Sequence, residues 1–340
     1  MSTMREVAAR AGVSAKTVSR VINDDPYVSE GVRRRVRQAI DELQYLPNTL
    51  ARTFRSGRDA FVGVAVPDLS DPFFATVVHA VERVARSRRT SVLVTSLGND
   101  PADERGAVEA LLSRQVAGLV ATPVAADQSY LKPWQARTAL VFIDRVPSRL
   151  SADSVVEDDH GGALAATAHL VGHGHRRIGF IGDALSVSTT ARRFGGYRAA
   201  LSSAGLPPDD RLTALGIDSP GAAVAAARRL LGLADPPTAL FSSNARCSIA
   251  LVPALQALGR TDVALVSFGD FPLADALTPA LTVVDQDPDA VGTMAATRLF
   301  DRLDHPERRF RRRTVLPVRL VPRSSCCSPD EIRSSLTPVT

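Results

Sequence analysis

Hydrophobic and polar positions alternate in two different ways along the chain. Up to about residue 47, apolar residues recur at intervals of three or four, which places them on one face of a helix. From residue 61 onward, short and nearly continuous apolar runs such as "FVGVAV", "AGLVAT" and "DVALVSF" alternate with stretches of helical spacing. Such runs are typical of parallel strands that are covered on both faces. The pattern predicts an all-α head followed by a doubly wound, parallel-sheet α/β body.

The head is expected to contain three helices with recognisable ends. Thr3 and Glu6 have the spacing of a capping box, and Gly12 is free to end the first helix in a left-handed conformation. Ser14 is a good cap for a second helix and Ser29 for a third. The inner stripes of the second and third helices are Val18, Val21 and Ile22, and Val32, Val36, Ile40 and Leu43.

Two short helices joined by a glycine-containing turn, with a third to close the core, form a helix-turn-helix. The second helix would place its first side chains against base edges in the major groove of DNA. The alternative is a plain three-helix bundle that binds nothing, but the exposed face is cationic and rich in hydrogen-bonding groups. The DNA-binding residues predicted in the head are Thr3, Ser14, Ala15, Lys16, Thr17, Ser19, Arg20, Asn23 and Ser29.

A short segment at residues 48–60 separates the head, residues 1–47, from the body. Pro47 breaks the third helix, and Asn48 can then cap "TLARTFRS". A helix of barely two turns is marginal in water. It carries Arg52 and Arg55 but has almost no core to pack on. The alternative interpretation is an ordinary linker.

Charge adds a reason to expect a polyanion as partner. The chain has 340 residues and a net charge of +5. Residues 1–60 carry eleven Lys and Arg against seven Asp and Glu, and residues 305–340 carry eight Arg against three acidic residues. Two basic ends and an acidic middle favour a polyanion as the partner of one end. The alternative is that the charged side chains are simply solvated on the surface, which would give the same net charges.

Several classes of protein are disfavoured by the sequence. No apolar run is long enough to cross a bilayer, and the N-terminus lacks the apolar core of a signal peptide, so a cytoplasmic protein is expected. Three cysteines suit neither a disulfide framework nor a zinc site. His169, His173 and His175 lie close together, but no acidic or cysteine partner is spaced to complete a metal site. We expect no metal, no cofactor and no catalytic residues.

The body, residues 61–323, has too many predicted strands for one comfortable sheet. We expect two lobes, an N-lobe of about 61–158 and 287–303 and a C-lobe of about 159–284 and 305–323. A ligand would lie in the cleft between them, at the carboxyl ends of the strands. Residues 324–340 are expected to form a disordered tail.

The head stretch "TMREVAARAGVSAKTVSRVINDDPYVSEGVRRRVRQAIDELQYLPNTLAR" resembles the lac-repressor (LacI/GalR) family. The resemblance continues more weakly across nearly the whole chain. It implies a periplasmic-binding-protein-like effector domain, a homodimer and a pseudo-palindromic double-stranded DNA operator. It also implies that residues 48–60 fold as a hinge helix on DNA and insert a wedge into the minor groove. The wedge is usually Leu in this family, and here the matching residue is Phe54. Asn48, Arg52 and Arg55 of the same segment are also predicted to bind DNA.

The resemblance also suggests which side chains line the cleft. Phe73 and Phe74 follow the first strand, where an aromatic face can cover a sugar, although paired Phe residues also suit a core. Asp144 and Arg145 end the fourth strand, where a simple ion pair is the alternative. The predicted effector-binding residues are Phe73, Phe74, Asp144, Arg145, Arg193, Asn244, Asp270 and Gln286. Many relatives have Asp where this chain has Ala245 and Gly269, so the identity of the ligand does not carry over.

The sequence therefore indicates a transcriptional repressor controlled by a small polar effector such as a sugar. One alternative is a sugar-binding protein without a gene-regulatory role, which the intact head disfavours. Another is an enzyme that uses Asp144 or Asp270 as an acid or base. No nucleophile elbow, phosphate-binding loop or dinucleotide fingerprint supports an enzyme.

Overall fold

The computed structural model describes residues 3–22, 25, 27–43 and 61–326. The chain divides into two compact units, Met1–Asp59 and Ala60–Thr340, here called the head and the body. Five predicted DNA-binding residues lie outside the described residues, namely Asn23, Asn48, Arg52, Phe54 and Arg55. Within the head, α1 spans Met4–Ala11, α2 spans Ala15–Ile22 and α3 spans Glu30–Glu42.

The three helices of the head enclose a small apolar core. Val7, Val18 and Val36 are fully buried at its centre, one from each helix. The Thr3 N–H donates to Glu6 Oε2 at 2.6 Å, and the Glu6 N–H donates to Thr3 Oγ1 at 3.3 Å, which confirms the capping box. Gly12 ends α1 with a φ of 62°. The predicted helix-turn-helix arrangement is therefore present.

The caps of α2 and α3 differ from each other. The Thr17 N–H donates to Ser14 Oγ at 3.1 Å, so Ser14 caps α2 as predicted. Ser29 occupies the position before α3, but its side chain makes no capping hydrogen bond there. The expectation that the Ser29 hydroxyl caps α3 is wrong.

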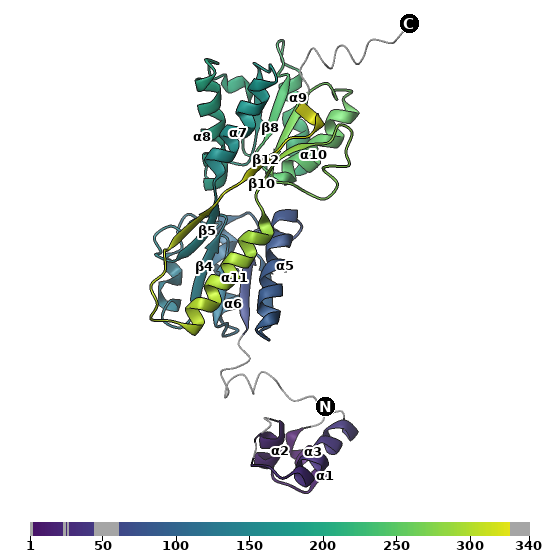
Figure 1. Ribbon diagram of the computed structural model, residues 1–340, viewed down its shortest axis with the longest axis vertical. Coiled ribbons are helices and arrows are strands. Elements are labelled where there is room, and N and C mark those ends of the chain that lie inside the picture. The colour runs from purple at the N-terminus through teal and green to yellow at the C-terminus, as the bar shows by residue number, and fades with distance from the viewer. Residues whose placement is uncertain (1–2, 23–24, 26, 44–60, 327–340) are drawn as a thin grey trace. The chain divides into compact units, whose positions relative to one another are not determined.

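The body has two six-stranded sheets, each in its own lobe (Figure 1). The sheet of the first lobe is parallel throughout. Its strands, in spatial order, are β2 (Val92–Ser96), β1 (Val62–Val66), β3 (Gly118–Ala121), β4 (Ala139–Ile143), β5 (Asp153–Glu157) and β11 (Arg313–Leu316). The second sheet has β7 (Thr213–Ala214), β6 (Ile178–Ile181), β8 (Ala239–Ser242), β9 (Ala264–Phe268), β10 (Thr282–Asp285) and β12 (Arg319–Val321). In this sheet β12 is antiparallel to β10.

Helices cover the sheets, as the apolar strands require. The first lobe contains α5 (Pro72–Ser87), α6 (Pro101–Leu112), α11 (Pro288–Asp304) and the 3-10 helix η1 (Ser129–Trp134). The second contains α7 (Asp159–Gly172), α8 (Ser188–Ser203), α9 (Pro220–Leu231), α10 (Ala245–Ala257) and the 3-10 helix η2 (Asp210–Leu212). Figure 1 shows α5 and α11 side by side, and they share one apolar core with β1, β3 and β4.

The chain passes between the lobes at three points, between β5 and α7, between β10 and α11, and between β11 and β12. The third crossing corrects the predicted lobe boundary. Residues 305–323 were expected in the C-lobe, but β11 pairs with β5 in the first sheet and only β12 joins the second. The apolar run before the tail thus forms two short strands that belong to different sheets.

The predicted tail also begins too early. Ser324–Cys326 form the 3-10 helix η3, in which Ser325 and Cys326 are buried. The Ser325 hydroxyl donates to the Leu265 carbonyl at 2.6 Å, so this turn is attached to β9. Residues 327–340 lie outside the described residues. Among the helices that the structure describes, none has the length and apolar character needed to cross a membrane.

Candidate DNA-binding surface and effector cleft

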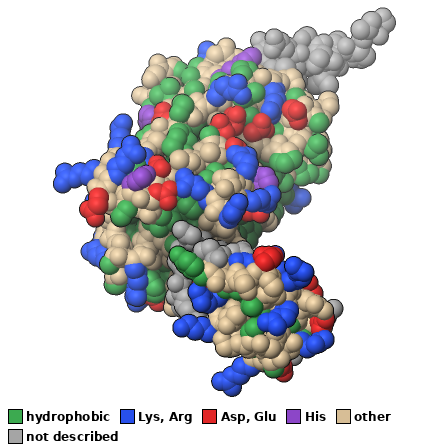
Figure 2. Space-filling model, turned by 60° about the horizontal axis from the view of Figure 1, so that its bottom comes forward, with side chains coloured by type: hydrophobic (Ala, Val, Ile, Leu, Met, Phe, Trp, Pro, Cys, Tyr) green, Lys and Arg blue, Asp and Glu red, His purple; other side chains and the backbone are tan. Residues whose placement is uncertain are grey.

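The outer face of α2 carries the side chains that would meet DNA. Lys16 is exposed, whereas Ala15 is half-buried and packs against the core of the head. Arg20 Nε donates to Asp25 Oδ2 at 2.8 Å, which holds the guanidinium beside the end of the helix. Figure 2 shows further Lys and Arg side chains across the visible face of the head. Lys16 is thus the more available of the two cations for a base edge, and Arg20 must leave or share Asp25.

The cleft forms where the two sheets present the carboxyl ends of their strands. Both sheets begin with the same order, β2-β1-β3-β4-β5 in one and β7-β6-β8-β9-β10 in the other. In such sheets ligands bind outside the carboxyl ends of the strands, where the strand order reverses. A cavity of about 60 Å³ lies there and draws residues from both lobes.

Seven of the eight predicted effector-binding residues line this cavity, namely Phe73, Phe74, Asp144, Arg145, Arg193, Asn244 and Gln286. Sequence reasoning missed others that line it, including Asp68, Asp71, Asn99, Asp183, Thr189 and Arg246. Their position could have been found by a simple rule, because most of them follow a strand within a few residues.

Phe73 and Phe74 belong to the core of the first lobe and also line the cavity. Asp71 caps α5 by accepting from the Phe73 N–H at 2.9 Å, and this fixes the two rings at the start of the helix. The rings meet edge to face, 5.1 Å apart, and both belong to the core of the first lobe while lining the cavity. They can therefore offer an apolar surface without themselves needing to move.

Asp144 and Arg145 stand at the end of β4 in an unusual backbone conformation. Asp144 has a φ of 63°, a left-handed value that non-glycine residues seldom adopt. Arg145 Nε lies 3.1 Å from Asp144 Oδ2, and Arg145 Nη1 donates to the Pro123 carbonyl at 3.0 Å. The strand-end ion pair is thus present, and it forms part of the cavity wall.

Arg193 is held on several sides within the second lobe. Its Nε donates to Asp159 Oδ1 at 2.8 Å, and its Nη1 donates to the Ser243 carbonyl at 2.7 Å. The guanidinium carbon lies 3.9 Å from the centre of the Phe268 ring. The side chain is only 5% exposed. Arg193 therefore presents a fixed guanidinium edge to the cavity rather than a mobile arm.

Asn244, Asp183 and Arg246 form a second polar group on the same side. Asn244 caps α10, because its Oδ1 accepts from the Cys247 N–H at 2.8 Å. Its Nδ2 donates to Asp183 Oδ2 at 3.1 Å, and Arg246 Nη2 donates to the other oxygen at 2.5 Å. Burial raises the pKa of the Asp183 carboxyl, while Arg246 opposes that change. Asp183 thus brings a carboxylate to this side of the cavity from the end of β6.

Asp270, the eighth residue predicted to bind the effector, does not line this cavity. Gly269 turns the chain away with a φ of 95°. Arg323 then holds the Asp270 carboxylate through two contacts of 2.7 and 3.2 Å. A Cβ atom at Gly269 would lie 2.9 Å from Gln286 Oε1. Gln286 thus occupies the space that a side chain at Gly269 would need.

Two buried carboxyls lie behind the cavity at the first crossing between the lobes. Glu157 ends β5, and neither of its oxygens has a hydrogen-bond partner among the described residues. Burial, together with the nearby Asp144 and Asp159, raises its pKa well above the ordinary value. Burial also raises the pKa of Asp159 to about 6, although Arg193 opposes the shift. The crossing therefore carries two acids with raised pKa values, of which Asp159 is paired with Arg193 and Glu157 is not.

A larger hollow of about 610 Å³ adjoins the inner cavity. The two share Asn99, Arg145, Asp183 and Arg246. Its other walls include the apolar side chains Val124, Val146, Val187 and Ile217. The inner cavity has the volume of about two liquid water molecules. A sugar-sized ligand must therefore extend into the outer hollow or open the lobes.

The described residues contain no group of three side chains suited to hold a metal ion. The rings of His169 and His173 are 4.6 Å apart, and His175 Nδ1 lies 2.9 Å from Thr238 Oγ1. These contacts occupy the histidines at the end of α7 and the start of the next strand.

A helix-turn-helix head on a two-lobed body with a polar cleft is the architecture of a ligand-binding transcriptional regulator. Residues 3–48 match the model of bacterial regulatory proteins, lacI family, and residues 167–326 match that of a periplasmic binding protein-like domain. The ribose operon repressor of Escherichia coli (strain K12) is 31% identical over 323 residues, which cover 94% of this chain and 98% of that protein. The chain belongs to the lacI family of bacterial regulatory proteins.

Solved structures agree with this assignment. The lac repressor dimer bound to operator and the anti-inducer ONPF is 26% identical, with a TM-score of 0.82, and the match covers 96% of this chain and 99% of that one. The complex of the transcriptional regulator CelR with cellobiose is 30% identical, with a TM-score of 0.69, and the match covers 96% and 100% of the two chains. These relatives are regulators rather than enzymes.

Proposed function

We propose that this protein is a transcriptional repressor that binds a pseudo-palindromic operator as a homodimer and is controlled by a small polar effector. The observation that carries the proposal is the joint presence of the helix-turn-helix head and the polar cleft in one chain. The head would read one half-site through α2, and arginine and lysine contacts to phosphate would supply salt-dependent affinity. We further propose that the protein acts in the cytoplasm and does not catalyse a reaction.

The chemistry of the cleft favours a ligand with several hydroxyl groups. Carboxylates at Asp144 and Asp183 accept hydrogen bonds, and the guanidinium groups of Arg145, Arg193 and Arg246 donate them. The rings of Phe73 and Phe74 would cover carbon–hydrogen faces. Relatives whose names mention ribose, or that were solved with cellobiose, support a sugar.

The effector would act by favouring one arrangement of the two lobes. Its influence on operator binding can be only as large as the difference between its affinities for the two arrangements. Residues 48–60 connect the body to the head, so a change between lobes would alter how the two heads of a dimer are spaced.

A thermal-shift screen of sugars, polyols and nucleobases tests this proposal. A ligand of the folded body raises the melting temperature by mass action. We expect a hit among sugars or related polyols, and the hit should also change operator affinity. A hit that is chemically converted on incubation would instead favour an enzyme.

A further inference from the structure

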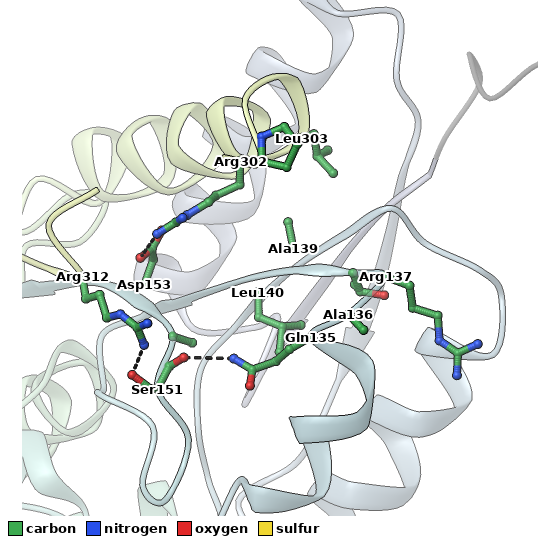
Figure 3. Close-up of a pocket in the computed structure, with 13 residues that line it drawn as sticks. Gln135, Ala136, Arg137, Ala139, Leu140, Ser151, Asp153, Arg302, Leu303 and Arg312 are labelled. Carbon is green, nitrogen blue, oxygen red and sulfur yellow. Dashed lines mark hydrogen bonds and ion pairs between the residues drawn. The ribbon is translucent and has the colours of Figure 1, made fainter. Parts of the chain in front are cut away.

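A second hollow lies at the other end of the first lobe, far from the effector cleft along the strands. It has a volume of about 400 Å³ and forms where β4, β5 and β11 begin (Figure 3). Residues 135–140 and 151–153 supply part of its wall, and the end of α11 and Arg312 supply the rest. Ala139, Leu140 and Leu303 give it an apolar floor. Its size is within the usual range for small-molecule sites.

An arginine-rich loop borders this hollow. Residues 305–313 contain five arginines and one glutamate. Arg302, Pro306 and Arg312 also line an adjoining depression, whose other walls include Arg308 and Arg309. The two depressions thus form one continuous basic surface, here called the arginine hollow.

Side-chain contacts hold this loop against α11, whereas a run of charges that is simply solvated would make none. The guanidinium groups of Arg298, Arg302 and Arg308 lie 5.0, 4.7 and 5.1 Å from the centre of the Phe310 ring. Arg298 Nη1 donates to the Arg311 carbonyl at 2.8 Å, and Arg302 Nη1 donates to the Arg308 carbonyl at 3.2 Å. The backbone of the loop is therefore attached to α11.

The charges of the arginine hollow do not balance. Asp153 is 3% exposed, and Arg302 already holds both of its oxygens at 2.7 and 2.9 Å, with Arg298 3.7 Å away. Arg312 donates to the Ser151 hydroxyl, as Figure 3 shows. Among the described residues, no carboxylate lies within 4.0 Å of the guanidinium groups of Arg308, Arg309 or Arg312. Glu307 also lines this depression, but it forms no ion pair with the three arginines and leaves an excess of positive charge, so an anion bound there would be stabilised.

We propose that the arginine hollow binds a small molecule that carries a phosphate group. Planar guanidinium forks match phosphate oxygens in pairs, and Arg308, Arg309 and Arg312 would supply them. The apolar floor would contact the carbon skeleton of the same molecule. This site is separate from the effector cleft, because the two share none of their lining residues.

Calorimetric titration of the full chain with inorganic pyrophosphate, at constant ionic strength, tests the site. We expect saturable binding that weakens roughly tenfold in Arg312→Gln or Arg309→Gln, since each removes a charge-assisted hydrogen bond. Arg228→Gln is the matched control, because it removes the same charge from an exposed position on α9. Melting temperatures without pyrophosphate should agree among all variants. No saturable binding by the wild type, or an equal loss in the control, would overturn the proposal.

A second experiment distinguishes a site for a small phosphate compound from a site for the phosphates of DNA. The same titration is repeated on protein that is saturated with a duplex selected for tight binding. Unchanged affinity for pyrophosphate supports a small-molecule site. Competition between pyrophosphate and the duplex would assign the arginine hollow to the DNA backbone and refute the proposal.

Discussion

Arg193 and Asp159 form a buried ion pair, with 2.8 Å between Nε and Oδ1, that joins α8 to the first turn of α7. The same guanidinium lines the effector cleft, so one side chain both stabilises the second lobe and faces the cavity. Any test of its binding role must therefore separate loss of ligand contact from loss of stability.

We predict that Arg193→Ala abolishes the response to effector while operator binding persists. Removing one partner of a buried pair should also lower the free energy of unfolding by about 3–5 kcal/mol, because the Asp159 carboxyl loses its counter-charge. Operator affinity with and without effector is measured by fluorescence anisotropy, beside a melting curve. Arg193→Lys keeps the positive charge, so it shows whether a lost response is due only to unfolding. Arg198→Ala, on the same helix, is the control. A normal effector response in Arg193→Ala would remove Arg193 from the site.

Gly269→Ala should weaken effector binding without affecting the head. The new Cβ would press on Gln286 Oε1 at 2.9 Å, and the left-handed φ of 95° adds roughly 1–3 kcal/mol of backbone strain. The ligand-induced rise in melting temperature reports the loss. Gly232→Ala, in the second lobe at the end of α9, provides a comparison outside the cleft. An unchanged ligand effect would show that Gln286 does not contact the effector.

Stability should fall as pH rises, because of the carboxyls behind the cavity. The folded-state pKa of Glu157 lies above its ordinary value of 4.5, so the folded protein binds this proton more tightly than the unfolded chain. Stability is then greatest below the unfolded-state pKa and is lost as pH rises through the folded-state pKa. Glu157→Gln should flatten the fall in melting temperature as pH rises above 4.5, the ordinary pKa of this group. Glu307→Gln, which alters an exposed glutamate, should leave the slope as in wild type; a steep slope retained by Glu157→Gln would contradict the assignment.

Exchange of Ala15 and Lys16 should change which half-site the head prefers. Lys16 is exposed, and lysine favours the two acceptors on a guanine edge in the major groove. Selection from a randomised duplex library identifies the preferred half-site of each protein. Because Ala15 is half-buried, circular dichroism must confirm that the exchanged head is folded. A folded head that binds no sequence would show that the two residues have a structural role instead.

Phe54→Ala should weaken specific operator binding far more than non-specific binding. The prediction rests on the resemblance to the lac-repressor family. In that family a side chain at this position enters the minor groove and opens a base step. Titrations against the selected duplex and an unrelated duplex give the two affinities at one salt concentration. Equal losses for both duplexes would exclude a wedge at Phe54.

The sequence predicted the head and the two-lobed plan because periodicity and capping act locally. β5 is hard to predict from the sequence, since Asp153 and Glu157 at its two ends leave only Val155 and Val156 as an apolar run. The sequence also placed residues 305–323 in a single lobe, because pairing partners such as β5 for β11 are set by tertiary contacts. Spacing alone does not reveal such contacts.

The residues that line the cleft were also predicted only in part. Side chains that directly follow a strand, such as Asp144 and Asn244, were found, because their direction is set by the strand before them. Asp270 was misplaced because the turn at Gly269 and the pairing with Arg323 carry it outward. Asp183 also follows a strand, β6, by two residues, but it belongs to no recognised motif and its contacts with Asn244 and Arg246 are tertiary, so it was overlooked.

The central claim is that one small molecule in the cleft controls sequence-specific DNA binding by the head. The most direct measurement is the anisotropy of a labelled, selected operator titrated with the full chain, with and without the ligand found by thermal shift. We predict that the ligand changes operator affinity by tenfold or more, about 1.4 kcal/mol of coupling, and leaves non-specific binding unchanged. A ligand that stabilises the body yet leaves operator affinity the same would contradict this account.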